Sequence, residues 1–246
     1  MRTPTPAQLL EVWERGSDQS AAVRARLLFG ASCDDLDGAA QAALPLGQRD
    51  ARLLELRARL FGPEVTGTAT CPRCVTAVEA TFRCSDLQAR AGTDAAGAGE
   101  RTLWTKGARV RYRLPAGADL EALAAHADVA AAREDLLARC VLDAEWDGTP
   151  CAPRELPPPV VDALAQAMAE ADPQADLRLA FACPECGHAW ELTFDIASFL
   201  WQELDAWAQR LLRDIDALAR AYHWREADIL ALSPRRRQAY LELCAS

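Results

Sequence analysis

Apolar side chains recur with a helical period along most of the chain. In the first quarter this period predicts helix from residue 6 to residue 61, punctuated at residues 44–47 and ended by Gly62 and Pro63. Helices therefore dominate the expected fold. The same pattern predicts further, shorter helices over residues 119–127, 129–142, 160–171, 226–232 and 234–244.

The longest predicted helix runs from Ile196 to about Tyr222 and is rich in large apolar groups. Such a helix must be covered either by other elements of the same chain or by another protein. Its two tryptophans, Trp201 and Trp207, are therefore candidate contacts for a partner protein.

A basic run opens the last predicted helix. Ser233 is a good N-cap and Pro234 suits the first helical position, which places Arg235, Arg236 and Arg237 in the first turn. The helix dipole disfavours positive charge there by about 0.3–1 kcal/mol for each arginine. Two interpretations stay open: acids of the preceding helix compensate the charge within the chain, or the cluster serves a partner.

Two short cysteine motifs resemble each other across the chain. The first is Cys71-Pro72-Arg73-Cys74, and Cys183-Pro184-Glu185-Cys186 follows 112 positions later. Alternation of apolar and polar residues over 75–82 and 188–194 predicts a strand after each motif. The likeness extends beyond the cysteines, because three residues after each motif fall at equal offsets: Glu79, Thr81 and Phe82 in one, Glu191, Thr193 and Phe194 in the other.

A C-x-x-C turn between two strands lets both sulfurs point at one centre, and two such turns supply the four ligands of a tetrahedral zinc site. The sequence therefore predicts an α+β fold, mostly helical, with a small antiparallel zinc-ribbon element built from two C-P-x-C hairpins. We expect Cys71, Cys74, Cys183 and Cys186 to bind one structural zinc ion, so that Cys183→Ser would unfold or aggregate the protein.

Other interpretations of the two motifs compete with a shared site. Zinc could occupy two separate sites, one of them completed by His188 or Cys84. A redox motif would need a helix after the cysteines, where a strand is predicted. Disulfides within each motif would need an oxidising compartment, which nothing in the sequence indicates. The remaining cysteines are expected to be small buried hydrophobic residues: Cys33, Cys84, Cys140, Cys151 and Cys244.

Composition is that of a soluble globular protein, with 50% hydrophobic and 26% charged residues among 246. The net charge of −9 opposes binding to nucleic acid or to an anionic membrane. No apolar run has transmembrane length and the N-terminus does not resemble a signal peptide, so a cytoplasmic location with reduced thiols is expected.

The patterns divide the chain into an N-terminal helical region (1–62), a first zinc-knuckle hairpin (63–90), a flexible linker (91–100), an inserted α/β region (101–173), a second zinc-knuckle hairpin (174–195) and a C-terminal helical region (196–246).

Several segments carry a resemblance to a known family: LPLGQRD (44–50), LFG (60–62), VRYRLP (110–115), LLARCVL (136–142) and DILALSPRRRQAYL (228–241). The chain is similar to the T4-type phage baseplate hub assembly chaperone family, in a longer form with zinc knuckles that occurs in contractile injection system gene clusters. The resemblance implies a non-enzymatic role, with baseplate or hub proteins as partners. One departure is Val75, at a position where such knuckles often carry the glycine that the second motif has as Gly187.

Two further classes of function remain as alternatives. A zinc-ribbon nucleic-acid adaptor would use arginines of the predicted strand 109–113, or Arg235 to Arg237, against phosphates. For the strand arginines, a solvated outer face is the preferred interpretation. A metal-dependent hydrolase would need an open coordination position, which a four-cysteine site lacks. We find no phosphate-binding loop, nucleophile elbow or H-E-x-x-H motif in the sequence.

Overall fold

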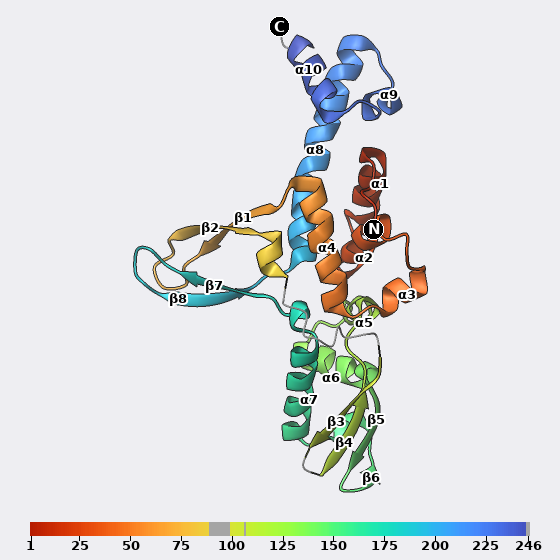
Figure 1. Cartoon of the computed structure of the whole chain (residues 1–246), viewed down its shortest axis with the longest axis vertical. Coiled ribbons are helices and arrows are strands. Elements are labelled where there is room, and N and C mark those ends of the chain that lie inside the picture. Colours follow the sequence, from red (N-terminus) through yellow and green to blue (C-terminus); the bar gives the residue numbers. More distant parts are fainter. Residues whose placement is uncertain (89–98, 106, 245–246) are drawn as a thin grey trace.

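The computed structural model describes residues 1–88, 99–105 and 107–244. The chain has the outline of a cross (Figure 1), in which a central helical body carries an arm of β-hairpins to one side, a sheet-based lobe below and a helical tip above. Helices dominate and the sheets are small and antiparallel, so the fold is α+β, as predicted. Most of the predicted linker, residues 91–100, lies outside the described residues.

The body packs its helices around one apolar core. The region predicted as helical from 6 to 61 contains several separate helices, because the chain turns after Gly16, after Ser32 and at Pro45. Leu53 and Leu200 are fully buried at the centre of this core. The body comprises α1 (Pro6–Gly16), α2 (Ala21–Ser32), α3 (Gly38–Ala43), α4 (Leu46–Phe61) and the first half of α8 (Ile196–Tyr222).

Local signals in the sequence fix the ends of these helices. Thr5 and Gln8 form a capping box at the start of α1, and the carboxylate of Asp195 accepts hydrogen bonds from two amides in the first turn of α8. Gly62 ends α4 with a φ of 94°, a backbone conformation that only glycine adopts without strain. The chain therefore leaves the body and enters the arm at Gly62.

Arg57 ties the body to the base of the arm. Its guanidinium, in a residue that is 4% exposed, donates to Glu203 of α8 at 2.7 and 2.9 Å. It also donates to the carbonyl of Gly62 at 2.9 Å and to that of Glu64 at the first residue of the arm. A buried charge that satisfies so many acceptors at once holds α4, α8 and the first strand of the arm in one arrangement.

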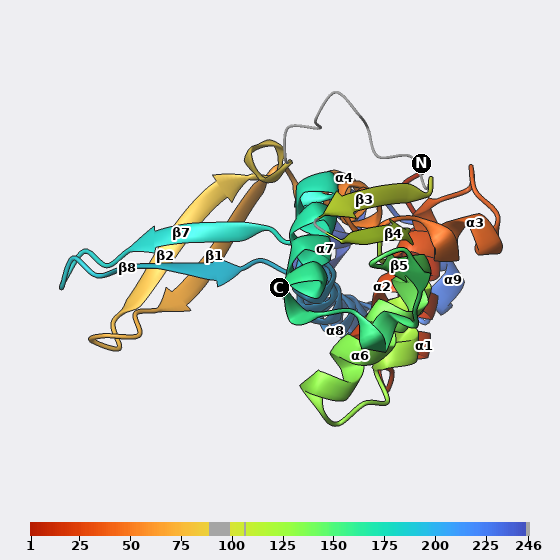
Figure 2. The ribbon, with the colours of Figure 1, turned by 90° about the horizontal axis from the view of Figure 1, so that it is seen from below.

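The arm consists of two β-hairpins, each a separate two-stranded antiparallel sheet. They correspond to the two strand pairs predicted around the cysteine motifs. The first hairpin pairs β1 (Glu64–Thr70) with β2 (Ala77–Arg83), and the second pairs β7 (Arg178–Ala182) with β8 (Ala189–Thr193). Figure 2 shows the second hairpin lying over the first, both pointing away from the body.

The lobe is a four-stranded antiparallel sheet of order β3-β4-β5-β6, with α7 packed against one side. Val110 and Leu164 are fully buried between sheet and helix. The elements of this part are β3 (Arg101–Thr105), β4 (Ala108–Tyr112), α5 (Gly117–Leu123), α6 (Val129–Cys140), β5 (Val141–Trp146), β6 (Thr149–Pro150) and α7 (Pro158–Ala171).

The helix predicted over 129–142 was too long, because it took in the start of strand β5. Tyr112 of β4 faces Val141, whereas the preceding Arg111 faces Asp143, so Leu142 is an extra residue at a bulge. The bulge leaves Leu142 41% exposed and breaks the alternation that would have indicated a strand. A local irregularity in the sheet therefore concealed the strand from the sequence pattern.

The basic face predicted for the strand around residue 110 is engaged within the chain. Arg109 binds both Asp143 and Glu145 of β5, and Arg113 makes a bidentate pair with Asp119. Arg111 lies 3.7 Å from Glu100. These arginines therefore serve the lobe itself, and nothing in their contacts favours a phosphate-binding role.

The tip consists of the second half of α8 with α9 (Glu226–Leu230) and α10 (Pro234–Cys244). It has a core of its own, in which Leu211, Leu218 and Ile229 meet Leu10 from α1. The helix α8 spans Ile196–Tyr222, as the apolar period predicted, and ends at His223 in the left-handed conformation.

Buried acids lie where the body meets the lobe. The carboxylate of Asp172 accepts a hydrogen bond of 2.9 Å from the amide of Gly47, and a side chain on Gly47 would collide with it. Asp50 pairs with its neighbour Arg49 at 2.7 Å. Burial raises the pKa of Asp50 to about 6 against the attraction of Arg49, and the charges of Asp195 and Asp172 add to the rise.

This raised pKa predicts a pH dependence of stability. The folded state holds a proton on Asp50 more tightly than the unfolded state does, so this group stabilises the fold at low pH and loses that contribution as pH rises through about 6. Relative to Asp50→Asn, the wild-type protein should gain about 1 kcal/mol in free energy of unfolding between pH 7 and pH 5. Urea denaturation of both proteins at the two pH values measures the difference, and parallel behaviour of the two would contradict it.

Candidate metal centre

The two cysteine motifs fold into equivalent knuckles. In the first, the amide of Val75 donates to the carbonyl of Cys71 at 2.9 Å; in the second, Gly187 donates to Cys183 at the same distance. A second bond closes each turn, from the amide of the first cysteine to the carbonyl five residues later, again at 2.9 Å in both. Each knuckle thus presents its two sulfurs on one side of a tight turn between strands.

Val75 adopts the conformation that the second knuckle gives to glycine. Its φ is 63°, against 68° for Gly187, and it is 76% exposed. A β-branched residue in the left-handed region is strained, by about 1–2 kcal/mol. The first knuckle, with Val75 in place of the usual glycine, therefore has the same turn geometry as the second, at a local conformational cost.

The four sulfurs of the two knuckles converge at the far end of the arm. Their Sγ atoms all lie within 4.8 Å of one another. The pairs that touch come from different knuckles: Cys71 and Cys186 at 3.7 Å, and Cys74 and Cys183 at 3.5 Å. Ligands at the usual Zn–S distance on a tetrahedron stand about 3.8 Å apart. The four cysteines can therefore hold one metal ion, and all nine cysteines of the chain are free thiols.

The electrostatics of this cluster favour a cation at its centre. The hydroxyl of Thr76, 3.3 Å from Cys74 Sγ, and the amide of Thr76 lower the pKa of Cys74 to about 6. The amide of His188 favours the thiolate of Cys186, but partial desolvation and the neighbouring sulfurs outweigh it and raise the pKa of Cys186 to about 12. Four thiolates at this distance repel one another unless a positive ion sits between them.

Exchange of one knuckle for the other reproduces the contacts of the arm. Cys71 and Cys74 of the first knuckle correspond to Cys183 and Cys186 of the second. The contact between Cys71 and Cys186 therefore has an equivalent between Cys183 and Cys74, and both contacts are present. Phe82 and Phe194, which hold equal offsets in the two motifs, meet each other edge to face with centroids 5.6 Å apart. The sequence repeat therefore forms a pseudo-symmetric pair of hairpins, joined by sulfurs at one end and by phenylalanines at the base.

The other candidate ligands and cysteines stand apart from this cluster. His188 stacks on Trp190 at 6.2 Å, and Cys84 is buried beside Arg57 at the base of the arm. The alternative of two separate sites is therefore wrong for the part of the chain that the structure describes. Cys33 and Cys140 are buried, as expected. Cys244 is exposed near the C-terminus, so the interpretation as a buried hydrophobic residue does not hold there.

Comparison with models of known protein families gives a match that spans most of this fold. The family described as T4 bacteriophage base plate protein matches residues 28–201, which is well over half of the 246-residue chain. The chain belongs to this family. No curated protein and no solved structure matches it. The match covers the arm, the lobe and most of the body, and it leaves α1 and the tip outside.

Family membership gives this base plate protein a structural role in a baseplate and implies contact with other baseplate components. Within residues 1–88, 99–105 and 107–244, no helix combines the length and apolar character needed to cross a bilayer.

The two tryptophans of α8 that were candidates for partner contact are not exposed on the surface. Trp201 is 7% exposed, with its ring against Gly16 and the guanidinium of Arg24 lying 4.7 Å above it. A side chain on Gly16 would collide with this ring, so the glycine serves close helix packing. Trp207 is half-buried between the cores of body and tip. Trp201 therefore belongs to the core of the base plate protein, and its aromatic character misled the sequence interpretation.

The three arginines that open α10 do not behave alike. Arg237 is 8% exposed and pairs with Asp214 of α8 at 3.3 Å. Arg235 and Arg236 are exposed and make no ion pair with any described residue, including the acids of α9. Compensation within the chain thus explains one arginine of the run and leaves the other two unpaired.

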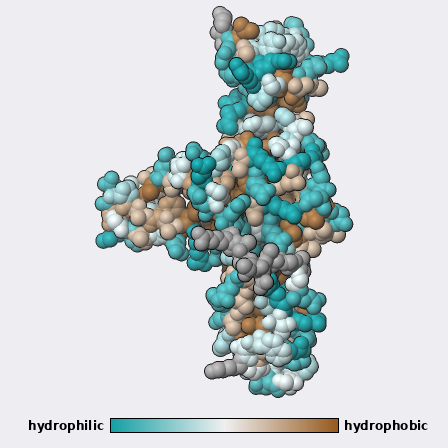
Figure 3. Space-filling model, viewed as in Figure 1, coloured by the Kyte–Doolittle hydropathy of each residue, from teal (hydrophilic) through white to brown (hydrophobic). Residues whose placement is uncertain are grey.

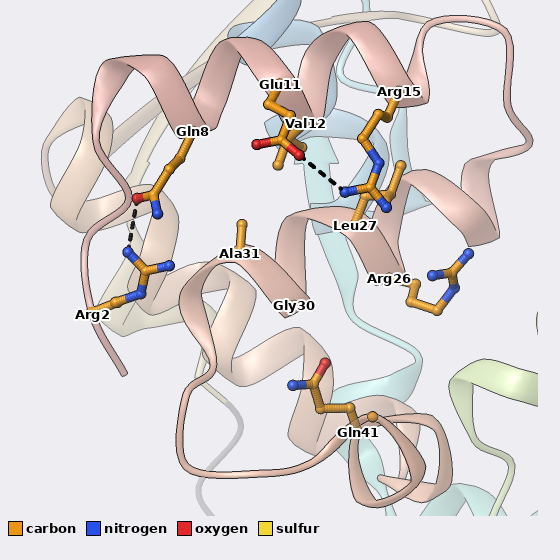
Figure 4. Close-up of a pocket in the computed structure, with 11 residues that line it drawn as sticks. Arg2, Gln8, Glu11, Val12, Arg15, Arg26, Leu27, Gly30, Ala31 and Gln41 are labelled. Carbon is orange, nitrogen blue, oxygen red and sulfur yellow. Dashed lines mark hydrogen bonds and ion pairs between the residues drawn. The ribbon is translucent and has the colours of Figure 1, made fainter.

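A shallow cavity of about 350 Å³ lies between α1, α2 and α3 (Figure 4). The charged side chains that line it already have partners: Arg15 pairs with Glu11, Arg26 with Glu121 and Arg2 with Asp34. Val12 and Leu27 form an apolar floor that also belongs to the body core. The cavity offers no unpaired acid–base group among its lining residues, so it does not compete with the cysteine cluster as a chemical site.

Removal of one sulfur should release the metal and loosen the arm. The structure revises the expectation that Cys183→Ser would unfold or aggregate the whole protein. The cluster stands at the far end of the arm, away from the helical core, so the loss of structure should be confined to the arm and far-UV circular dichroism should stay nearly unchanged. Amide exchange over residues 64–83 and 178–193 should become at least about a hundredfold faster, because structural metal binding contributes roughly 10–16 kcal/mol. Elemental analysis should fall from one metal ion per chain to none.

The matched control for this experiment is Cys244→Ser, which changes an exposed thiol in α10 and should alter neither metal content nor exchange. A Cys183→Ser protein that keeps a full metal ion and slow exchange would disprove the shared site.

The strain at Val75 predicts opposite effects of reciprocal changes in the two knuckles. Val75→Gly should relieve the left-handed strain and raise stability by about 0.5–1 kcal/mol after the entropic cost of glycine. Gly187→Val should lower stability by at least as much, although its side chain would meet nothing within 4 Å. Thermal melting with metal bound measures both. Equal signs for the two variants would refute the conformational explanation.

Proposed function

We propose that this base plate protein is a non-enzymatic assembly chaperone or structural factor for the baseplate hub of a phage tail or contractile injection system. Family membership supports a baseplate role. The convergence of four cysteines from distant segments supports a role by binding, because four sulfurs fill a tetrahedral metal and leave no position for a reacting water.

We propose zinc as the metal of this site. A set of four thiolates at tetrahedral spacing suits zinc, or iron in an iron–sulfur setting, far better than a hard cation. The ion would join the two hairpins and so give the arm a fixed shape to present to other hub components. Elemental analysis distinguishes zinc from iron directly.

The competing function of nucleic-acid binding has little support. The arginines of β4 are held by acids of the lobe, and the net charge of −9 repels phosphate. Arg235 and Arg236 of α10 make no ion pair within the described part of the chain, but the first turn of α10 contains no aromatic side chain on which a base could stack.

Co-expression with the neighbouring baseplate genes tests the proposed function. The tagged full-length protein should capture one or more hub components from the lysate. A chaperone should be absent from purified particles, whereas a structural component should be found in both. Capture of none of the co-expressed baseplate proteins would overturn the proposal, and the Cys244→Ser protein serves as the control for handling of the thiols.

A further inference from the structure

We propose that β3, the outer strand of the lobe sheet, is a docking edge for an extended segment of another baseplate component, which adds to the sheet as a further strand beside Thr102 and Trp104. The proposal rests on the proposed function, because the partner is taken to be a baseplate protein. It goes beyond that function because it names the surface, the backbone conformation of the segment that fits it and the side chain that anchors it.

The sheet of the lobe has one open edge within the part of the chain that the structure describes. Its strand order places β3 and β6 at the two margins, and Figure 2 shows β3 outermost, with β4 and β5 following. Strand β6 has only two residues, and one of them is Pro150, which has no amide hydrogen to donate. Strand β3 has five residues and contains no proline. The edge at β3 is therefore the one to which a further strand can add.

The hydrogen bonds of β4 show which main-chain groups of β3 face outward. The carbonyl of Gly107 accepts a bond of 2.7 Å from the amide of Asp147, which lies opposite it at the end of the β4–β5 ladder. Residues of a central strand in an antiparallel sheet bond their two neighbouring strands alternately. The main-chain groups of Gly107 and Arg109 thus point to β5, and those of Val110 point to β3.

Thr102 and Trp104 present unpaired main-chain groups at the open edge. Val110 lies opposite Leu103, so the main chain of Leu103 bonds β4. The amides and carbonyls of its two neighbours, Thr102 and Trp104, therefore point away from β4. No described residue forms a main-chain hydrogen bond to these groups. An extended peptide is the partner that offers acceptors and donors at this spacing.

Trp104 gives this edge an apolar anchor. It is 72% exposed, and no other aromatic residue among those described is exposed. Leu103 packs with Val110 in the lobe core, so Trp104, the next residue of the strand, projects from the opposite face. The described strands of the arm have free edges too, but the only large apolar side chain that they expose is Leu192, at 41%. A side chain of an added strand would pack on the indole of Trp104.

The surroundings of Trp104 carry charge that is already paired. Arg109 lies opposite Trp104 on the same face and binds both Asp143 and Glu145. Figure 3 shows hydrophilic and apolar side chains mixed on the visible face of the lobe, below the body. A segment with an aliphatic or aromatic residue beside Trp104 therefore fits this edge better than a highly charged one.

A second copy of the chain is a poorer occupant of this edge than a baseplate component. Pairing of two β3 strands would join only five residues from each copy. That contact falls short of the ~1,200–2,000 Å² of surface that a stable interface buries. A component that also contacts other parts of the protein needs only a modest contribution from β3, which an edge pairing of this length can give.

The affinity of edge variants for a captured hub component tests the proposal. The component is captured by the full-length, zinc-loaded protein on co-expression with the neighbouring baseplate genes, and biolayer interferometry measures the purified pair. Thr102→Pro removes the outward amide hydrogen but leaves the bonds of β3 to β4, so it should weaken binding by about tenfold. The matched control, Thr102→Val, keeps the amide and should bind within about threefold of the wild-type protein. Equal affinity of the two variants would refute strand addition.

Truncation of the anchor gives a second, independent measurement. Trp104→Ala should weaken binding by about tenfold or more, because tryptophan is a frequent hot spot of interfaces. Its control is Val129→Ala, at another exposed apolar residue of the lobe, which should change affinity by less than about threefold. Circular dichroism verifies that each variant is folded. Equal losses at Trp104 and Val129 would refute the anchor.

Amide hydrogen exchange distinguishes strand addition from side-chain contact. In the free protein the amides of Thr102 and Trp104 should exchange quickly, whereas that of Leu103 is protected by β4. In the complex the two outward amides should slow by at least about tenfold. Unchanged exchange at both would contradict the added strand.

Two further outcomes separate this proposal from the proposed function and from a second copy. If Thr102→Pro and Trp104→Ala bind the hub component as tightly as the wild-type protein, the proposed function stands and the β3 edge is refuted. If the wild-type protein captures no baseplate protein, the proposed function fails, and the edge as a baseplate contact fails with it. Sedimentation velocity should show a monomer, and a dimer that Thr102→Pro dissociates would overturn the choice of partner.

Discussion

The arm depends on the convergence of four sulfurs from two knuckles that more than a hundred residues separate in the chain. Closing a loop of that length costs about 4–5 kcal/mol of chain entropy. A structural metal ion supplies roughly 10–16 kcal/mol on binding four thiolates, so it can offset that cost with a margin. The two hairpins have modest apolar faces, since only Val65, Ala69, Cys71 and Cys183 are buried among their strand and turn residues. The sulfur cluster is therefore the main reason that the arm has one shape.

The base of the arm is fixed by a second set of contacts, independent of the metal. Gln174, just before β7, donates to the carbonyl of Leu87, just after the first hairpin, at 3.1 Å. Arg57 holds the entry to β1 against Glu203. The chain thus leaves the arm and re-enters it at one place, and the lobe is an insertion between these two points. Such an arrangement lets the lobe keep a core of its own, while the base of the arm packs into the core of the body.

The parts of the fold that could be predicted from the sequence are those governed by local pattern. The cysteine spacing, its repetition with Phe82 and Phe194, and the apolar period of α8 each depend on residues close together in the chain. Strand β5 was missed because the bulge at Leu142 depends on the partner strand β4. Trp201 was misjudged because its burial depends on Gly16, far away in sequence and opposite it in space. What the sequence alone could not supply was therefore the identity of the neighbours that tertiary packing provides.

Burial also separates the arginines of the run that opens α10, which look equivalent in sequence. Arg237 fastens α10 to α8 through Asp214, whereas the flanking Arg235 and Arg236 are exposed and make no ion pair with any residue that the structure describes. The tip lies outside residues 28–201, the part of the chain that matches the family, and it has its own apolar core. The tip is nevertheless joined to the body, because Leu10 of α1 packs into its core and Trp207 lies between the cores of body and tip. The contacts that fix the arm lie elsewhere, at Arg57, at Glu203 and at the four cysteines.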